Sequence, residues 1–347
     1  MKKILLALTA ASALCSSALA TPFNSDAARF TLPEGQLVAH IDMERMRSSQ
    51  TFKDLAAMIT GNPAAQKDLE ELKARFGVDP INGIGSITLS VNAAAKGAPP
   101  EVAAYVTGAF PQAQILEALK KESKDFDAVK EGEHTMYVAQ NDSSTITFVK
   151  GGMLATGSDG AVKGDAVARK VLAGAGVTGA VKVTTGSFDG SKDVWATFQP
   201  SAAMVADMQA QNPMMGAFTA WTVSMDFTPG LHVHIEGKGT EAAASQIAAM
   251  ASMQLQQMQA SPQAAMLGGM MSKLSVTSKG ELLVVDMPLN QQDVNQLKMM
   301  AMMMMMSLQQ PKAQPSFPGL QAPVAPSVAP KAPAAPPALL APTPAPK

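Results

Sequence analysis

The feature that most constrains the fold is a series of short strand and helix patterns that occurs twice along the chain. Each series predicts a strand, a helical region, two strands with a helix after the second, a hairpin, and a final helix. The first series comprises strands 36–43, 85–92 and 101–108, helix 111–123, hairpin 144–158 and a helix near 161–173. The second comprises strand 193–200, helix 201–211, strand 220–227, the strand and helix of 230–250, hairpin 275–288 and helix 291–308. The segment 134–140 (HTMYVAQ) has no counterpart.

This order predicts an α+β fold of two similar units, each an antiparallel sheet with helices packed on one face. The two sheets could merge into one or stay separate, and the pattern favours neither. The expected division is a signal peptide, a first α+β unit, a second α+β unit and a disordered Pro/Ala-rich tail, at residues 1–20, 21–180, 181–310 and 311–347.

Local signals support several of these boundaries. Gly77 follows a helical pattern that ends at Phe76, as expected of a left-handed helix C-cap. Asp42 and Glu44 stand at the end of the first strand, where an acidic side chain suits the start of the next helix. A Lys-Gly pair marks the turn of both hairpins, at 150–151 and at 279–280.

The N-terminus predicts export. Two lysines precede the apolar run 4–14, and Ala18-Leu19-Ala20 offers small residues where a signal peptidase cleaves. Cleavage after Ala20 would remove Cys15, the only cysteine, so we expect no disulfide and no thiolate site in the mature protein. The expected location is the periplasm or the cell envelope.

Charge and composition exclude some classes of partner. Without the five lysines of the signal and the tail, 22 basic residues face 28 acidic residues, a net charge of −6. Nucleic-acid binding requires a basic face, so we expect none. No apolar stretch of the mature chain reaches the roughly 20 residues of a transmembrane helix. Residues 311–347 hold half of the 24 prolines and predict an extended tail.

Three segments carry a family resemblance. They are LVAHIDMERMRSSQTFKDL, RFGVDPINGIGSITL and GSDGAVKGDAV. They resemble a loose class of exported bacterial proteins of uncharacterised function, over about residues 36–175. The resemblance implies the duplicated α+β fold and brings no catalytic residue.

The segment LHVHIE (231–236) is the sharpest candidate for chemistry. In a strand, His232, His234 and Glu236 share one face, and two imidazoles with a carboxylate can ligate Zn²⁺. A strand with one solvated face shows the same alternation without any metal, so both readings stay open. No complete catalytic motif occurs, and we expect neither an enzyme nor a cofactor.

The second candidate is the methionine-rich stretch 298–306, which holds seven methionines. On a helix, Val294 and Leu297 fall on a core stripe, whereas Met299, Met303 and Met306 fall on the opposite side. Three interpretations compete: packing on both sides, a surface for an apolar ligand, partner protein or second copy, and a thioether site for Cu(I). The leading functional hypothesis is an exported, non-enzymatic binding or envelope-organising protein that uses this helix. The alternative is a periplasmic metal-handling protein for Cu(I) or Zn²⁺.

Overall fold

The computed structural model of the chain describes residues 25–33, 35–92, 100–122, 126–139, 144–158, 164–174, 192–259 and 268–309. The expected signal peptide (1–20) and tail (311–347) lie outside these residues. The chain divides into two compact units, Met1–Met300 and Ala301–Lys347. The first unit contains the whole sheet and is described below.

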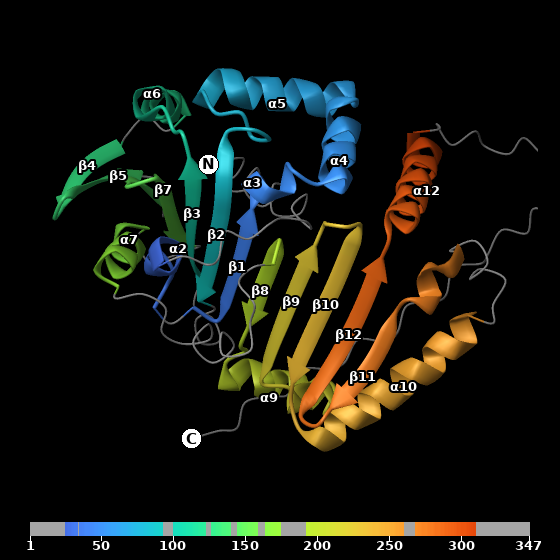
Figure 1. Cartoon of the computed structure of the whole chain (residues 1–347). Helices are drawn as coiled ribbons and strands as arrows, with labels where there is room; N and C mark the ends of the chain where they lie inside the picture. Colours follow the sequence, from blue (N-terminus) through green and yellow to red (C-terminus); the bar gives the residue numbers. More distant parts are fainter. Residues whose placement is uncertain are drawn as a thin grey trace, which may run out of the picture. The chain divides into compact units, whose positions relative to one another are not determined.

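Twelve strands in the described part form one antiparallel sheet (Figure 1). In spatial order they are β11 (Ser275–Lys279), β12 (Leu282–Leu289), β10 (Leu231–Lys238), β9 (Ala220–Asp226), β8 (Val194–Phe198), β1 (Leu37–Asp42), β2 (Ile84–Asn92), β3 (Glu101–Gly108), β7 (Gly152–Ser158), β6 (Ser144–Val149), β5 (His134–Ala139) and β4 (Phe126–Glu131). The α+β class and the antiparallel pairing predicted from the sequence are confirmed.

The two predicted series merge into this single sheet. Strands β1-β2-β3-β7-β6 of the first series and β8-β9-β10-β12-β11 of the second follow the same spatial order. They meet where β1 pairs with β8, side by side at the middle of the sheet (Figure 1). The division into two α+β units stays a prediction, because the strands form one sheet. Strand β4, a charged edge strand, was not predicted.

The cross-strand register divides the sheet into rows of side chains, because residues paired in register point to the same face. One row is apolar across nine strands, and we call it the apolar row: Phe148, Met153, Val106, Ile87, Ile41, Val194, Met225, Val233 and Met287. The neighbouring row lies on the opposite face, and we call it the mixed row: Thr147, Leu154, Tyr105, Thr88, His40, Trp195, Ser224, His234 and Asp286.

Most described helices pack on the face of the apolar row. They are α3 (Met43–Met46), α4 (Gln50–Thr60), α5 (Pro63–Phe76), α6 (Gln112–Glu122), α10 (Glu241–Gln259) and α12 (Gln291–Gln309). Short helix α2 (Ser25–Arg29) and helix α7 (Gly164–Ala173) instead pack on the mixed row, where Val167 and Val171 contact Leu154 and Tyr105. The prediction of helices on one face is therefore wrong for the first series, whereas α10 and α12 of the second series both pack on the face of the apolar row. The prediction fails for the first series because Tyr105 and Leu154 make the mixed row apolar at β3 and β7. An apolar stretch on that face must also be covered by a helix.

Three further elements complete the described helices: α9 (Ala202–Gln211) and the 3₁₀ turns η1 (Met215–Ala217) and η2 (Gly268–Ser272). Helix ends follow the local signals. Asp42 caps α3, and its Oδ1 accepts from the backbone N–H of Glu44 at 2.9 Å and of Arg45 at 3.1 Å. Gly77 ends α5 with φ of 69°, a conformation that a Cβ would oppose. Both capping predictions are confirmed.

Candidate functional site

The candidate site lies on β10 and β12 near one edge of the sheet. Strand β10 alternates polar and apolar residues, and the register with β12 places Asp286 directly opposite His234. His232 points to the same face, two residues earlier on β10. The predicted sharing of one face by His232, His234 and Glu236 follows from this register. Asp286 joins them from a strand about 50 residues further along the chain.

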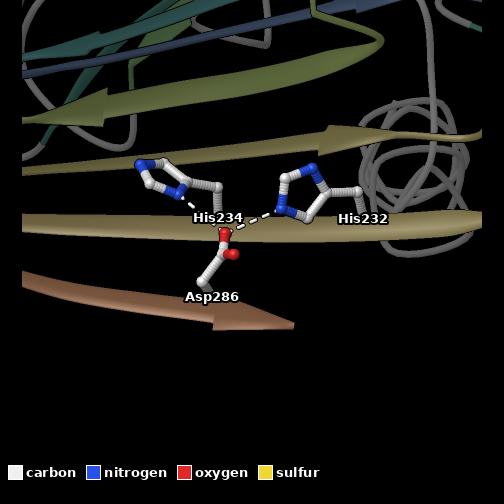
Figure 2. Close-up of side chains that lie close together, drawn as sticks. All are labelled: His232, His234 and Asp286. Atoms are coloured by element: carbon white, nitrogen blue, oxygen red, sulfur yellow. Dashed lines mark hydrogen bonds and ion pairs between the residues drawn. The ribbon is translucent and has the colours of Figure 1, made fainter. Parts of the chain in front are cut away.

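The two imidazoles converge on one carboxylate oxygen (Figure 2). His232 Nε2 lies 2.7 Å from Asp286 Oδ1, and His234 Nδ1 lies 3.0 Å from the same atom. All three ligand atoms lie within 4.8 Å of one another. The other ring nitrogen of His234, Nε2, lies 3.1 Å from Glu236 Oε1. The structure thus links four side chains in a chain of hydrogen bonds.

These contacts shift the pKa values of two groups. Partial burial alone would lower the pKa of His234, but its hydrogen bonds to Asp286 and Glu236 outweigh burial and raise it. Burial would likewise raise the pKa of Asp286, but the hydrogen bonds from His234 and His232 outweigh burial and lower it. The direction for His234 has a simple cause: both ring nitrogens face carboxylates, and only the protonated ring donates from both.

The group has the donor set and spacing of a metal site. Zn²⁺ bonds to imidazole nitrogen and carboxylate oxygen at about 2.0–2.2 Å, so tetrahedral ligand atoms stand roughly 3.3 Å apart. The observed separations from Asp286 Oδ1, 2.7 and 3.0 Å, require only a small opening to admit an ion. An ion would replace the protons that these atoms now share.

The site is reachable from solvent. The side chains of His232, His234 and Asp286 are 41%, 32% and 36% exposed. Helix α12 follows β12 but packs on the opposite face, where Val294 contacts Leu289. A binding site needs this access, whereas a structural metal is usually enclosed.

A second carboxylate, Asp226, stands directly opposite His232 on β9. It does not join the group, because its Oδ2 accepts from Lys192 Nζ at 2.6 Å and its Oδ1 faces the backbone N–H of Asp193. His232 therefore has two acidic residues near it in the sheet. It contacts Asp286, because Asp226 is paired with Lys192 and Asp193.

Asp286 is the site residue that sequence reasoning missed. The signal was present: it is a lone carboxylate in the otherwise apolar strand LLVVDMPL. Its relevance depends on the pairing of β10 with β12, which no motif encodes. Glu236, expected as a ligand, contacts the far side of the His234 ring.

The methionine candidate is described in part. Met299 lies on α12 and is 59% exposed, as the helical pattern predicts, whereas Leu297, expected in the core, is 37% exposed. Val294 is buried, as expected. The side chains of Met303 and Met306 lie outside the described part of the structure, so the predicted surface of three methionines stays a prediction.

Within the described ranges, none of the helices has the length and apolar character needed to cross a membrane. This agrees with the expectation of no transmembrane helix for that part of the chain.

Fold and site together define an α+β protein with one long antiparallel sheet and a half-exposed His-His-Asp group on its surface. No family model matches the sequence, and no curated protein matches it. Among solved structures, crystal forms I and IV of TP0453 are similar to this chain, with TM-scores of 0.41 and 0.42 and 8% identity. They cover 78% and 79% of this chain, which in turn covers 96% and 95% of theirs. Similarity at this level transfers no property from that protein.

Proposed function

We propose that this is an exported, non-enzymatic protein of the periplasm or cell envelope that binds a divalent transition-metal ion such as Zn²⁺. The ligands would be His232 Nε2, His234 Nδ1 and an Asp286 carboxylate oxygen. One observation carries the proposal: these three ligand atoms lie within 4.8 Å of one another on a half-exposed face of the sheet. The lysine-led apolar N-terminus supports export.

The chemistry of the donors favours a borderline divalent ion. Two imidazoles and one carboxylate suit Zn²⁺ and Cu²⁺, whereas Cu(I) prefers thioethers and thiolates. Three protein donors would leave at least one coordination position for water or an incoming ligand. The site is thus better suited to an exchangeable ion than to a structural one.

Calorimetric titration of the metal-free protein with Zn²⁺ tests the proposal. Wild type should bind one ion per chain with micromolar or tighter affinity, and both His232→Gln and Asp286→Asn should weaken binding by at least about 100-fold. The matched control is His134→Gln, because His134 also stands beside a carboxylate, Glu133, at 3.6 Å, but outside the group. Equal binding by wild type and Asp286→Asn, or no binding by wild type, would refute the proposal.

A second candidate function rests on exposed apolar side chains of the second series. Met253 on α10 and Met299 on α12 are 58% and 59% exposed, and flexible thioether side chains suit adaptable contacts with an apolar ligand or partner protein, including a second copy. Residues 242–259 of α10 carry no charge, which also favours contact.

The mass in solution tests the self-association form of this candidate. Wild type should be larger than a monomer, and the combined variant Met299→Gln, Met303→Gln and Met306→Gln should be a monomer. The control is Met215→Gln, since Met215 is 38% exposed and lies in η1, away from α10 and α12 in the chain. A monomeric wild type would exclude self-association.

A further inference from the structure

We infer that Glu236 is a positioning residue rather than a metal ligand: it holds the His234 ring so that Nδ1, and not Nε2, faces the ion. This inference rests on the proposed function and corrects the donor set that the strand alternation alone suggests. It also fixes the ion between β10 and β12 rather than along β10.

The two nitrogens of the His234 ring face different carboxylates. Nδ1 lies 3.0 Å from Asp286 Oδ1, which His232 Nε2 also approaches at 2.7 Å. Nε2 lies on the other side of the ring, 3.1 Å from Glu236 Oε1. A neutral imidazole has one N–H and one lone pair, so a hydrogen bond donated by Nε2 leaves the lone pair on Nδ1.

That tautomer is the one that the converging donors require. With Nε2–H donated to Glu236, the lone pair of Nδ1 points at the point where His232 Nε2 and Asp286 Oδ1 also converge. Metal-bound histidines in proteins almost always donate their second N–H to a carboxylate, carbonyl or water, which orients the ring and strengthens the ligand. Glu236 has the position and chemistry for this role.

The alternative, in which Glu236 itself is a ligand, requires a different geometry. An ion bound by Glu236 and by Nε2 would lie on the far side of the ring from Asp286. His232 would then be excluded, because its Nε2 approaches Asp286 and not Glu236. That alternative has one imidazole and one carboxylate, whereas the Nδ1 side has two imidazoles and one carboxylate.

Burial supports the same assignment. Glu236 is held at 27% side-chain exposure beside His234, on the same face of β10, opposite Thr222 of β9 and Val284 of β12. Val284 is 5% exposed, so the neighbour on that side is apolar and offers no ligand atom. On the β12 side, Glu236 therefore has no second ligand for an ion, and its side chain hydrogen-bonds to His234.

The experiment compares wild type with the variants Glu236→Ala, Glu236→Gln and Asp286→Asn of the full chain. Chelator competition measures the Zn²⁺ affinity. The visible absorption of bound Co²⁺ reports which atoms coordinate the ion. Glu236→Ala should weaken Zn²⁺ binding by about 10- to 100-fold and leave the Co²⁺ bands at their wild-type positions. Glu236→Gln, whose amide oxygen still accepts from Nε2–H, should recover most of the affinity. Asp286→Asn should lose more affinity and also change the Co²⁺ spectrum, because a ligand is altered.

The control is Lys238→Ala, two residues further along β10 on the same face, which should leave affinity and spectrum unchanged. A Co²⁺ spectrum that changes in Glu236→Ala as it does in Asp286→Asn would make Glu236 a ligand and overturn the inference. Unchanged affinity in Glu236→Ala would overturn it as well.

A second measurement separates this inference from the proposed function. The variant Asp286→Ala removes the carboxylate at Nδ1 and keeps Glu236 beside Nε2. Long-range ¹H–¹⁵N spectra of this metal-free variant, recorded at a pH above the pKa of His234, report which ring nitrogen carries the proton. Asp286→Ala should show the proton on Nε2, and the double variant Asp286→Ala, Glu236→Ala should lose that preference. If wild type fails to bind metal but this pattern is present, only the metal site is refuted, whereas a proton on Nδ1 in Asp286→Ala would refute the role of Glu236.

Discussion

Equivalent positions of the two strand series carry different residues on the same face of the sheet. In the first series, Tyr105 on β3 and Leu154 on β7 are 3% and 0% exposed beneath α2 and α7. In the second, the matching strands β10 and β12 carry His234 and Asp286, whose side chains are 32% and 36% exposed. The helix after β7 covers the mixed row, whereas the helix after β12 packs on the apolar row.

The difference shows how one strand order can serve two purposes. A covered face favours apolar or hydrogen-bonded side chains, since a buried unpaired carboxylate or imidazole costs several kcal/mol. An open face can hold such groups at little cost, because water and mutual hydrogen bonds satisfy them. The position of the last helix therefore decides whether the row is core or candidate site.

The largest expected effect tests this difference at matched positions. Leu154→Ala should lower the free energy of unfolding by about 2–5 kcal/mol, because it opens a cavity under α7. Asp286→Ala, at the matching place on β12, should change it by less than about 1 kcal/mol, because the site is half-exposed. Urea unfolding of both variants measures the two values, and similar losses would show that the two faces do not differ in this way.

The second expected effect compares two histidines of the same row. Burial lowers the pKa of His40 to about 4, although nearby Asp42 acts in the opposite direction. The unfolded chain therefore takes up a proton near pH 6.5 that the folded protein takes up only near 4, and stability falls as the pH drops between these values. The loss attributable to His40 should be roughly 2 kcal/mol between pH 7 and pH 5.

The variant His40→Gln isolates this contribution from that of Asp193, whose pKa burial raises to about 6 and which acts in the opposite sense. Between pH 7 and pH 5, His40→Gln should lose less stability than wild type, by roughly 2 kcal/mol, because the contribution of Asp193 is common to both proteins. The raised pKa of His234 predicts the reverse sign: its contribution is present below the unfolded pKa and is lost as the pH rises through the folded value. Equal pH dependence in wild type and His40→Gln would contradict the assignment.

The third expected effect concerns the site alone. An ion must displace the proton on His234, whose pKa the two carboxylates raise, so Zn²⁺ affinity should fall as the pH is lowered. We expect a loss of at least about tenfold per pH unit below that pKa. Titrations across a pH series measure the slope, and an affinity that does not vary with pH would argue against histidine ligands.

The smallest expected effect contrasts the two sides of α10. Met253 is 58% exposed and Leu255 is 8% exposed. Met253→Gln should change the free energy of unfolding by less than about 0.5 kcal/mol, whereas Leu255→Ala should cost about 2 kcal/mol or more. A large loss in Met253→Gln at low protein concentration would show that this methionine packs within the chain.

Much of the fold was predictable because its signals are local. The strand β3 occupies the predicted residues 101–108, and Gly77 ends its helix as expected, since alternation and capping depend on a few neighbouring residues. Strand β4 was not predicted, because a charged edge strand lacks the apolar alternation of a half-buried strand. The packing of α2 and α7 on the face of the mixed row was not predicted either. The face to which Tyr105 and Leu154 point depends on the cross-strand register, which local sequence patterns do not determine.

For the candidate site, alternation by itself determined that His232, His234 and Glu236 share one face of one strand. The tertiary structure decided the rest: the pairing of β10 with β12 brings in Asp286, and the path of the chain after β12 leaves the group uncovered. The physical reason is the distance along the chain over which each feature is determined. Side-chain alternation is a property of the local backbone, whereas cross-strand register and helix packing depend on contacts between residues far apart in the chain.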